Sequence, residues 1–308
     1  MKKTLTYHIT TPDISQTVEQ FLRKQGYSKH LLIRLKQSPM GLSVGGEAVC
    51  SNHRLCEGEI LEVRLEESAD SQHIVPTAMA LDIVYEDEDL LVINKPAGLP
   101  IHPSQGHYEY TLANGMAYYF RQKGEPFICR VVNRLDRDTT GLLIVARHGL
   151  SSAILSEMVK NRQIHREYLA VVSGITDAGG CIDAPIARAE DSTIMRTVDL
   201  IRGERACTRY RLVFYNPEID CSLVALTLET GRTHQIRVHM NYIGHPLLGD
   251  FLYNPDYRFI RRQTLHSHRL AFEHPITKEP MTFESELPED MKFIYPLDSL
   301  SYKKRTCS

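Results

Sequence analysis

The sequence predicts an α+β fold in which a large, mixed, mainly antiparallel sheet is flanked by helices and follows a small α+β module. The chain has 308 residues, of which 42% are hydrophobic and 24% are charged, so it can bury one large and one small core. From residue 78 onward, short apolar runs typical of strands are interspersed with helical patterns. A polar segment that ends in Pro76 precedes them. The expected organisation is a small module, a linker, a large domain and a tail, at residues 1–66, 67–77, 78–298 and 299–308.

The small module should contain two helices followed by short strands. Ser15 can cap a first helix that ends near Gly26, and Ser28 can cap a second helix with leucines at helical spacing. Two strands then flank a turn at Gly45–Gly46, and a last strand follows Gly58. Helices followed by tight β-turns are the pattern of a compact α+β unit.

The large domain should combine short strands with at least two helices. Apolar runs predict strands at Ile83–Tyr85, Leu90–Ile93, Tyr168–Val172 and Ser222–Leu228. Helical spacing of apolar residues predicts a helix over Leu150–Gln163. Thr233 can cap a further helix that runs to Tyr242, with Gly244 as its end. These elements favour one large sheet with helices packed on it.

The formal net charge of −2 is the sum of very different segments. Residues 67–90 contain seven Asp or Glu residues and no Lys or Arg, whereas residues 1–66 have a balance of +2 and residues 91–308 a balance of +3. A solvated linker followed by a surface turn is our interpretation of the acidic stretch. A near-zero charge disfavours a nucleic-acid partner at the scale of the whole chain. The rest of the chain is basic, however, so nucleic acid can still bind at a local basic cleft.

The sequence also predicts the compartment. The N-terminus, MKKTLTYHITTPD, has no apolar run after its lysines, and no segment approaches the ~18 apolar residues of a membrane span. The seven cysteines are scattered and form no Cys-x-x-Cys pair. We therefore expect a cytoplasmic protein with reduced thiols, no cysteine-based zinc site and no membrane contact.

The densest charged segment is Arg130–Asp138, which leads directly into the apolar run Leu142–Val145. Asp136 lies between Arg134 and Arg137 in this segment, and adjacent cations favour an ionised carboxylate. An ionised, partly shielded aspartate can act as a nucleophile or a general base. The same pattern also occurs in structural ion pairs, and the spacing alone leaves both interpretations open.

One motif within this segment resembles a known signature. Asn133–Leu142, Asn-Arg-Leu-Asp-Arg-Asp-Thr-Thr-Gly-Leu, resembles the signature His-Arg-Leu-Asp-x-x-Thr-Ser-Gly-Leu of the RluA family of pseudouridine synthases. Further family motifs follow in order over roughly residues 80–285, at Tyr85–Pro103, Arg166–Gly174, Thr230–His239, Gly244–Asp250, Leu265–Leu270 and Phe272–Pro275. Asn133, Arg166 and Thr140 replace the family's usual His, Lys and Ser. The resemblance implies the pseudouridine synthase fold for the large domain.

Three residues match the catalytic residues of the family. Asp136 matches the essential aspartate, which reacts with the target uridine while its glycosidic bond is cut and the base is rejoined to the ribose through carbon five. Tyr168 matches the tyrosine that packs on the target base and helps to remove the proton from carbon five. Arg237 matches the arginine that pairs with the aspartate and orients it.

The resemblance also implies RNA contacts around these three residues. Arg134 matches the arginine that is expected to fill the space left by the extruded uridine, and extrusion costs ~a few kcal/mol. The other expected RNA-binding residues are Asn133, Arg137, Arg232, His234, Gln235, Lys95 and His102. Two of them have alternatives, because Arg232 can pair with Glu229 and Lys95 can belong to a turn that shapes the cleft.

The first 66 residues resemble the S-four-type RNA-binding domain, which is named for a protein of the small ribosomal subunit. The resemblance rests on the helix pair, the glycine turn and Gly58 before the last strand. The first helix lacks the Arg-Leu-Asp start that is usual in that family, and an unrelated small α+β module is the alternative.

The expected function is that of an RNA pseudouridine synthase that isomerises specific uridines. Ribosomal large-subunit RNA is the expected substrate and transfer RNA the runner-up. Isomerisation adds and removes no atoms, so we expect no cofactor and no metal, and we expect a monomer. Two other classes stay open. A non-catalytic RNA-binding or ribosome-assembly factor would be free to lose Asp136, Tyr168 and Arg237, and a metal-dependent hydrolase that used the histidines would be inactivated by a chelator.

Overall fold

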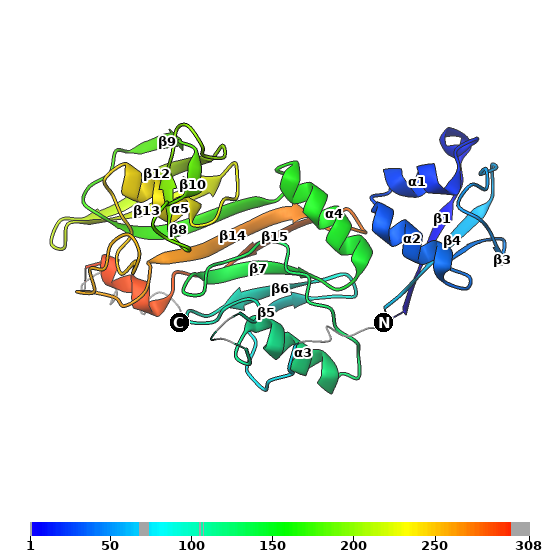
Figure 1. Cartoon of the computed structure of the whole chain (residues 1–308), viewed down its shortest axis with the longest axis horizontal. Coiled ribbons are helices and arrows are strands. Elements are labelled where there is room, and N and C mark those ends of the chain that lie inside the picture. The colour runs from blue at the N-terminus through cyan, green and yellow to red at the C-terminus, as the bar shows by residue number, and fades with distance from the viewer. Residues whose placement is uncertain (1, 68–73, 105, 107, 297–308) are drawn as a thin grey trace, which may run out of the picture.

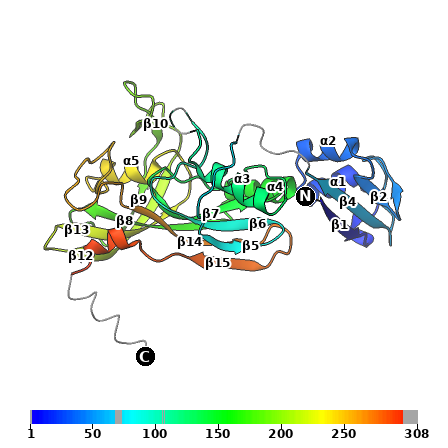
Figure 2. The same ribbon diagram turned by 90° about the horizontal axis from the view of Figure 1, so that it is seen from below.

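The protein is described by a computed structural model over residues 2–67, 74–104, 106 and 108–296; the expected tail at 299–308 and most of the expected linker lie outside the described residues. Two sheets form the framework, one of four strands within residues 2–66 and one of nine strands within residues 83–284 (Figure 1). The α+β fold class and the large mixed sheet are therefore confirmed. A two-stranded ribbon of β10 (Ile186–Arg188) and β11 (Arg196–Val198) stands beside the larger sheet (Figure 2).

The small module has two helices packed on a four-stranded antiparallel sheet. Its elements are β1 (Lys2–His8), η1 (Thr11–Asp13), α1 (Val18–Lys24), α2 (Lys29–Gln37), β2 (Leu42–Val44), β3 (Glu47–Ala48) and β4 (Ile60–Glu66), with strand order β1-β4-β2-β3. Ser28 caps α2 as predicted, because its hydroxyl accepts a hydrogen bond from the Leu31 amide. The predicted Ser15 cap of α1 is wrong, since Thr17 and Gln20 form a reciprocal capping box there. The strand β1 was not predicted.

The nine-stranded sheet is mostly antiparallel. Its strands are β5 (Ile83–Glu86), β6 (Leu90–Lys95), β7 (Thr140–Ala146), β8 (His165–Ser173), β9 (Gly179–Asp183), β12 (Cys207–Asn216), β13 (Cys221–Leu228), β14 (Leu265–Glu273) and β15 (Pro280–Glu284). They follow the order β5-β6-β7-β14-β8-β13-β12-β9, and β15 pairs with β14. Only the β7–β14 pair is parallel among the described strand pairs of this sheet.

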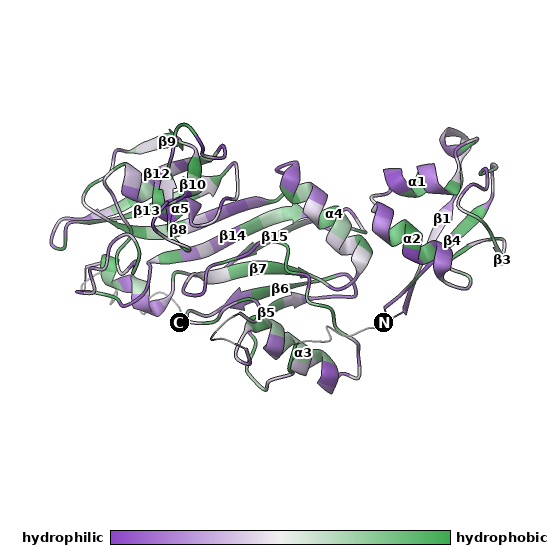
Figure 3. Ribbon diagram, viewed as in Figure 1, coloured by the Kyte–Doolittle hydropathy of each residue, from purple (hydrophilic) through white to green (hydrophobic). Residues whose placement is uncertain are grey.

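Helices cover both faces of the larger sheet. On one face, α3 (Leu112–Gln122) and α5 (Gln235–Tyr242) pack against alternate residues of the strands, such as Leu143 of β7 and Ala170 of β8. On the other face lie α4 (Gly149–Lys160) and the 3-10 helix η2 (Glu289–Ile294). The strand β7 is buried from both sides and is hydrophobic from Leu142 onward (Figure 3). Among the described residues, no helix has the length and hydrophobicity needed to cross a bilayer.

The small module is docked on the large domain through α4. One hydrophobic cluster runs from the core of the module through α4 to β6 and β7. Ile154 lies so close to Gly26 that a Cβ at that glycine would be 2.6 Å from its Cγ1 atom, so only glycine fits this contact. Leu31 lies beside Gly149 in the same interface. The two sheets are therefore held together by a shared core, with α4 between them.

Two acids of the acidic stretch, Glu67 and Asp89, contribute to this interface, which corrects the prediction of a solvated surface at these two positions. The Glu67 carboxylate is buried, ion-paired with Arg130 at 2.5 Å, and accepts a hydrogen bond from the Gly149 amide. Asp89 is also buried and accepts from Lys3 of β1 at 2.5 Å. Partners that are distant in sequence stabilise these buried charges, and the charge pattern alone could not show them.

Candidate active site

The aspartate loop, residues 133–139, is presented at the start of β7. Asn133 fixes one end, because its buried amide donates to the Leu142 carbonyl and its oxygen accepts from the Ile144 amide. Gly141 lies at the other end, where β7 pairs in parallel with β14. Its φ is +103°, and a Cβ there would lie 2.2 Å from the Ser267 carbonyl oxygen. Asparagine and glycine at these positions therefore hold the loop rigidly against the sheet.

Lys95, the last residue of β6, also stabilises the aspartate loop. Its ammonium donates to three backbone carbonyls, those of Pro96, Leu99 and Arg137, at 2.7–3.0 Å. Burial lowers the pKa of Lys95 to about 7. Three carbonyl acceptors around one nitrogen nevertheless match the three donors of the ammonium form. Lys95 therefore fixes the peptide next to Asp136.

Asp136 shares one arginine with a second aspartate. Arg237 of α5 donates from Nη1 to Asp136 Oδ2 at 2.9 Å and makes a bidentate pair with Asp250 at 2.6 and 2.7 Å. Arg237 and Asp250 are fully buried, whereas Asp136 remains about one-third exposed. Burial acts to lower the pKa of Arg237, but Asp250 and Asp136 together raise it, so the guanidinium stays charged. Two carboxylates share this one buried cation, so Asp136 is held in place from within the core.

The start of α5 brings a histidine to the aspartate. His234 has a left-handed backbone with φ of 58°, and its Nε2 lies 3.8 Å from Asp136 Oδ2. The pKa of His234 is lowered, chiefly because the ring is buried, and Asp136 opposes that shift. Gln235 closes the turn: its side chain accepts from Thr230 and donates to the Cys207 carbonyl. The predicted Thr233 cap of this helix is therefore wrong.

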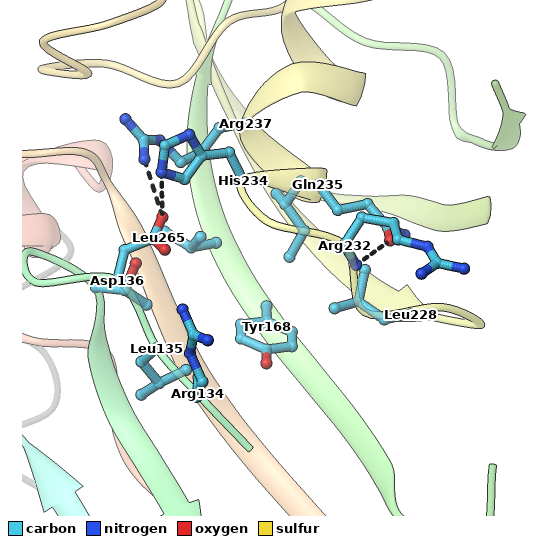
Figure 4. Close-up of a pocket in the computed structure, with 12 residues that line it drawn as sticks. Arg134, Leu135, Asp136, Tyr168, Leu228, Arg232, His234, Gln235, Arg237 and Leu265 are labelled. Atoms are coloured by element: carbon cyan, nitrogen blue, oxygen red, sulfur yellow. Dashed lines mark hydrogen bonds and ion pairs between the residues drawn. The ribbon is translucent and has the colours of Figure 1, made fainter. Parts of the chain in front are cut away.

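Tyr168 of β8 forms the floor of the pocket beside Asp136 (Figure 4). The side chain is buried, and this burial raises the pKa of its hydroxyl, while Arg166 opposes the shift and Asp136 adds to it. The phenol is therefore protonated at neutral pH. With its hydroxyl protonated, the Tyr168 side chain offers the pocket a flat apolar ring and not a phenolate base.

These side chains line one cavity on the face of the sheet that carries α5 (Figure 4). Its charged and polar members come from the aspartate loop, from β8, and from the β13–α5 loop and α5. Its lining residues are Arg134, Leu135, Asp136, Thr139, Tyr168, Leu228, Arg232, His234, Gln235, Ile236, Arg237 and Leu265. Asp136, Tyr168 and Arg237, predicted from separate motifs, thus meet in one place.

The predicted RNA contacts divide into accessible and buried residues. Arg134, Arg137, Arg232 and His102 are exposed. Arg137 pairs with Asp138 at 2.8 Å rather than with Asp136, and Arg232 pairs with Glu204 rather than with Glu229. Although His102 is exposed as a residue, its ring is partly shielded and lies near Arg134, and this shielding, followed by the arginine's charge, lowers the pKa of His102.

A correction applies to Asn133, Lys95 and Gln235. All three are buried, and their polar atoms already bind the protein's own backbone. They shape the aspartate loop and the start of α5 and do not offer free groups to RNA.

Among the residues that the structure describes, the one group with the spacing of a metal site is Asp87, Asp89 and His274. It lies at the interface with the small module and not in the pocket. His274 hydrogen-bonds to Asp87 at 2.9 Å, and Asp89 pairs with Lys3 and His148. The described groups of the cluster thus already have hydrogen-bond or ion-pair partners within the protein.

The chain belongs to the RNA pseudouridylate synthase family. Residues 89–242, which contain Asp136, Tyr168 and Arg237, match the family model described as "RNA pseudouridylate synthase". This match confirms the resemblance that the motifs implied and identifies the protein as an enzyme, an isomerase that makes pseudouridine in RNA.

Individual relatives extend over most of the chain. It is 44% identical over 276 residues to "Uncharacterized RNA pseudouridine synthase YjbO" of Bacillus subtilis, covering 89% of this chain and 96% of the relative. It is 40% identical over 243 residues to "Ribosomal large subunit pseudouridine synthase D" of Zymomonas mobilis, covering 74% and 76%. The solved structure of "Human RNA Pseudouridylate Synthase Domain Containing 1" superposes with a TM-score of 0.58 at 26% identity, covering 74% of this chain and 95% of that one.

Sequence reasoning missed two members of the site. Asp250 appeared only as the end of a Gly-Asp motif, although it binds Arg237 through both carboxylate oxygens. Arg166 appeared only as a replacement for lysine, although it lies beside Tyr168. The alternation of β8 was the available signal for Arg166, because residues two apart on a strand share a face. Nothing in the sequence pairs Asp250 with an arginine 13 residues away.

Proposed function

We propose that this enzyme isomerises specific uridines in ribosomal large-subunit RNA and that Asp136 is the group that reacts with the target nucleotide. The observation that supports this role most directly is the placement of Asp136. Its carboxylate is accessible at the mouth of the pocket and is oriented by the buried pair of Arg237 and Asp250.

The reaction rearranges bonds within one nucleotide. The bond between ribose carbon one and uracil nitrogen one breaks, the base turns within the pocket, and a bond forms between the same ribose carbon and carbon five. Carbon five loses a proton and nitrogen one gains one, so atoms and charge balance without a cofactor. The site must therefore hold a detached base close to the ribose and keep a carboxylate ionised.

Each of these requirements matches a group in the pocket. Arg237 holds the Asp136 carboxylate at 2.9 Å and places a positive charge beside it. The buried ring of Tyr168 offers a stacking surface for uracil, and such stacking is worth ~1–3 kcal/mol per base. Leu228 and Leu265 complete the apolar lining. Water exclusion by these side chains strengthens the electrostatic contacts inside the pocket.

We propose that Arg134 fills the position that the target uridine leaves in the RNA. A uridine in a stacked RNA must be extruded before it can reach Asp136, at a cost of ~a few kcal/mol. Arg134 is exposed at the rim of the pocket, and no ion pair holds it within the described part of the chain. A planar guanidinium can stack between bases and offset part of that cost.

Large-subunit RNA is proposed as the substrate because several relatives are named for it. The relatives from Zymomonas mobilis and Vibrio cholerae, 40% and 37% identical, are both called "Ribosomal large subunit pseudouridine synthase D". Transfer RNA is the second candidate. We further propose that the small module binds RNA and that the protein works in the cytoplasm as a monomer.

The test compares pseudouridine maps of total RNA from cells with and without the gene. We expect one or a few sites in large-subunit RNA to disappear and to return with the wild-type gene but not with the Asp136→Asn variant. Loss of sites in transfer RNA alone would refute the ribosomal assignment. An unchanged map together with altered ribosome assembly would instead support a non-catalytic factor.

A further inference from the structure

A second cavity, a groove of about 680 Å³, adjoins the catalytic pocket. It lies between the end of α4, the start of β8 and the loop that joins β13 to α5. Its cations are Lys160, Arg162, Arg166, Arg209, Arg232 and Arg269. Only two carboxylates, those of Glu167 and Glu229, line it as well. The lining is therefore basic, although Glu157, Glu204 and Glu284 pair with Lys160, Arg232 and Arg269 from its edge.

The cations of the groove are reachable from solvent. Arg209 and Arg162 both pair with Glu229, at 2.8 and 3.6 Å, so one carboxylate is shared by two cations. Arg269 pairs with Glu284 at 3.1 Å. These three arginine side chains remain between 48% and 63% exposed. Exposed ion pairs contribute little to stability, so the arginines can exchange these partners for a stronger anion at small cost.

Arg166 supplies an unused donor at the inner end of the groove. Its Nε is buried, and it has no hydrogen-bond acceptor among the described residues. The guanidinium lies against Gly231, where a Cβ would be only 3.7 Å from Nη1. A buried N–H group without an acceptor is unfavourable, and a small turn of the guanidinium toward an anion in the groove would satisfy it. Arg166 therefore indicates an anion that binds from the groove.

The groove and the catalytic pocket are continuous. Leu228 and Arg232 line both cavities, and Arg166 contacts Tyr168 on the floor of the pocket. Figure 4 shows Leu228 and Arg232 at the side of the pocket away from Asp136. A strand whose target base occupies the pocket would thus continue directly over the groove.

We propose that this basic groove binds the phosphodiester backbone of the RNA strand that adjoins the target uridine, with Arg166 as the contact nearest the base. Arginine recognises phosphate through paired N–H donors, and a row of arginines suits consecutive phosphates. The inference rests on RNA being the substrate but not on which RNA it is. An acidic protein could also bind a basic groove, but continuity with the base pocket favours a nucleic-acid strand.

The first experiment measures binding of a short labelled RNA hairpin by fluorescence anisotropy at several salt concentrations. Arg209→Gln and Arg269→Gln change exposed side chains on two different strands, so each checks the other. We expect each variant to weaken binding about three- to tenfold and to lower the slope of log affinity against log salt by about 0.7–0.9. Lys123→Gln is the matched control, an exposed cation paired with Glu86 at the opposite end of the sheet.

Glu229→Gln gives the decisive test because its effect has the opposite sign. Removing this carboxylate frees Arg209 and Arg162 for phosphate, so RNA should bind about two- to fivefold more tightly. A side chain that served only the fold would weaken binding when replaced. Thermal unfolding of each variant confirms that the fold is retained.

Two results would overturn the proposal. One is unchanged affinity and salt slope in both arginine variants, and the other is equal weakening by Lys123→Gln or by Glu229→Gln. A hairpin of unrelated sequence should show the same changes, because phosphate contacts do not read bases. The proposal therefore survives if pseudouridine mapping points to transfer RNA, and the substrate assignment survives if the groove variants bind normally.

Discussion

Replacing Asp250 with asparagine removes one charge from the buried pair that holds Arg237. The substitution keeps the shape of the side chain and the oxygen that accepts the Leu252 and Tyr253 amides at 3.0 and 3.3 Å. It leaves the guanidinium with one carboxylate, that of Asp136, in place of two. Because both partners are fully buried, the loss should cost about 3–5 kcal/mol of unfolding free energy. Because Arg237 keeps its contact with Asp136, we expect a cost near the lower end of this range.

The assay is urea unfolding, with Asp290→Asn as the matched control. Asp290 pairs with Arg262 through two hydrogen bonds of 2.7 Å, the same geometry as Asp250 with Arg237, but its side chain is 50% exposed. Solvent reaches the Asp290 carboxylate, and the buried Arg262 also donates to the Asp138 and Gln263 carbonyls, so the control should cost clearly less than Asp250→Asn. Equal costs for the two variants would refute the burial argument.

Activity provides the second readout of Asp250→Asn. A guanidinium released from Asp250 can turn to bind Asp136 through two donors, which displaces the carboxylate from its position in the pocket. Misplacement by about 1 Å can cost ~100-fold in rate. We expect kcat to fall by that order in single-turnover pseudouridine formation, while RNA affinity stays within about twofold, since phosphate contacts are untouched.

Three further predictions concern residues of the pocket. Asp136→Asn should abolish isomerisation but retain the fold and RNA binding, as measured by nucleoside chromatography and anisotropy; turnover at the wild-type rate would rule Asp136 out as the reacting group. Tyr168→Phe should bind RNA normally, because the ring remains, whereas Tyr168→Ala should lose affinity as well as rate; equal affinity of the two would exclude stacking. Burial holds the pKa of His234 below 6.5, so the imidazole is neutral at pH 7 and is protonated only on further acidification. His234→Gln should therefore leave the pH–rate profile unchanged above pH 6.5, and an acid limb above that pH that vanishes in the variant would contradict this.

Local patterns predicted much of the fold. The Ser28 cap, the Gly45–Gly46 turn and the alternating or continuous apolar runs each depend on neighbouring residues, and each element is present. The motifs also predicted the meeting of Asp136 with Arg237, which are 101 residues apart. That prediction came from the resemblance, because no local rule of pairing or periodicity reaches over such a distance.

Features that depend on distant partners could not be predicted from local patterns. From the local pattern alone, Asp136 was expected to pair with Arg134 and Arg137, its neighbours in sequence, and only the family resemblance predicted Arg237. Instead Arg137 turns to Asp138, and an arginine from α5 takes its place. Asn133 is a second example: it was expected to contact RNA, but its side-chain amide hydrogen-bonds to the backbone of β7. In both cases tertiary packing decides which of several equally suitable polar groups becomes the partner.

The acidic stretch shows that a count of charges does not reveal which charged side chains are buried. Glu67 and Asp89 belong to a run of acids that suggests a solvated surface, yet both are buried against Arg130 and Lys3. Only the fold brings these cations within reach. The helix α3 was missed for a related reason, because Asn114 and Gly115 lie on its buried side, where they weaken the apolar period.

The core shared by the small module and α4 has a practical consequence for anyone who dissects this enzyme. A chain shortened by residues 1–66 would expose Ile154 to water and leave Asp89 without its lysine. Inactivity of such a fragment would then report a damaged scaffold rather than a missing RNA contact. The interface between the small module and α4 is packed, so the distance between the module and the pocket is fixed. An RNA that contacts both must therefore present two features at that one separation.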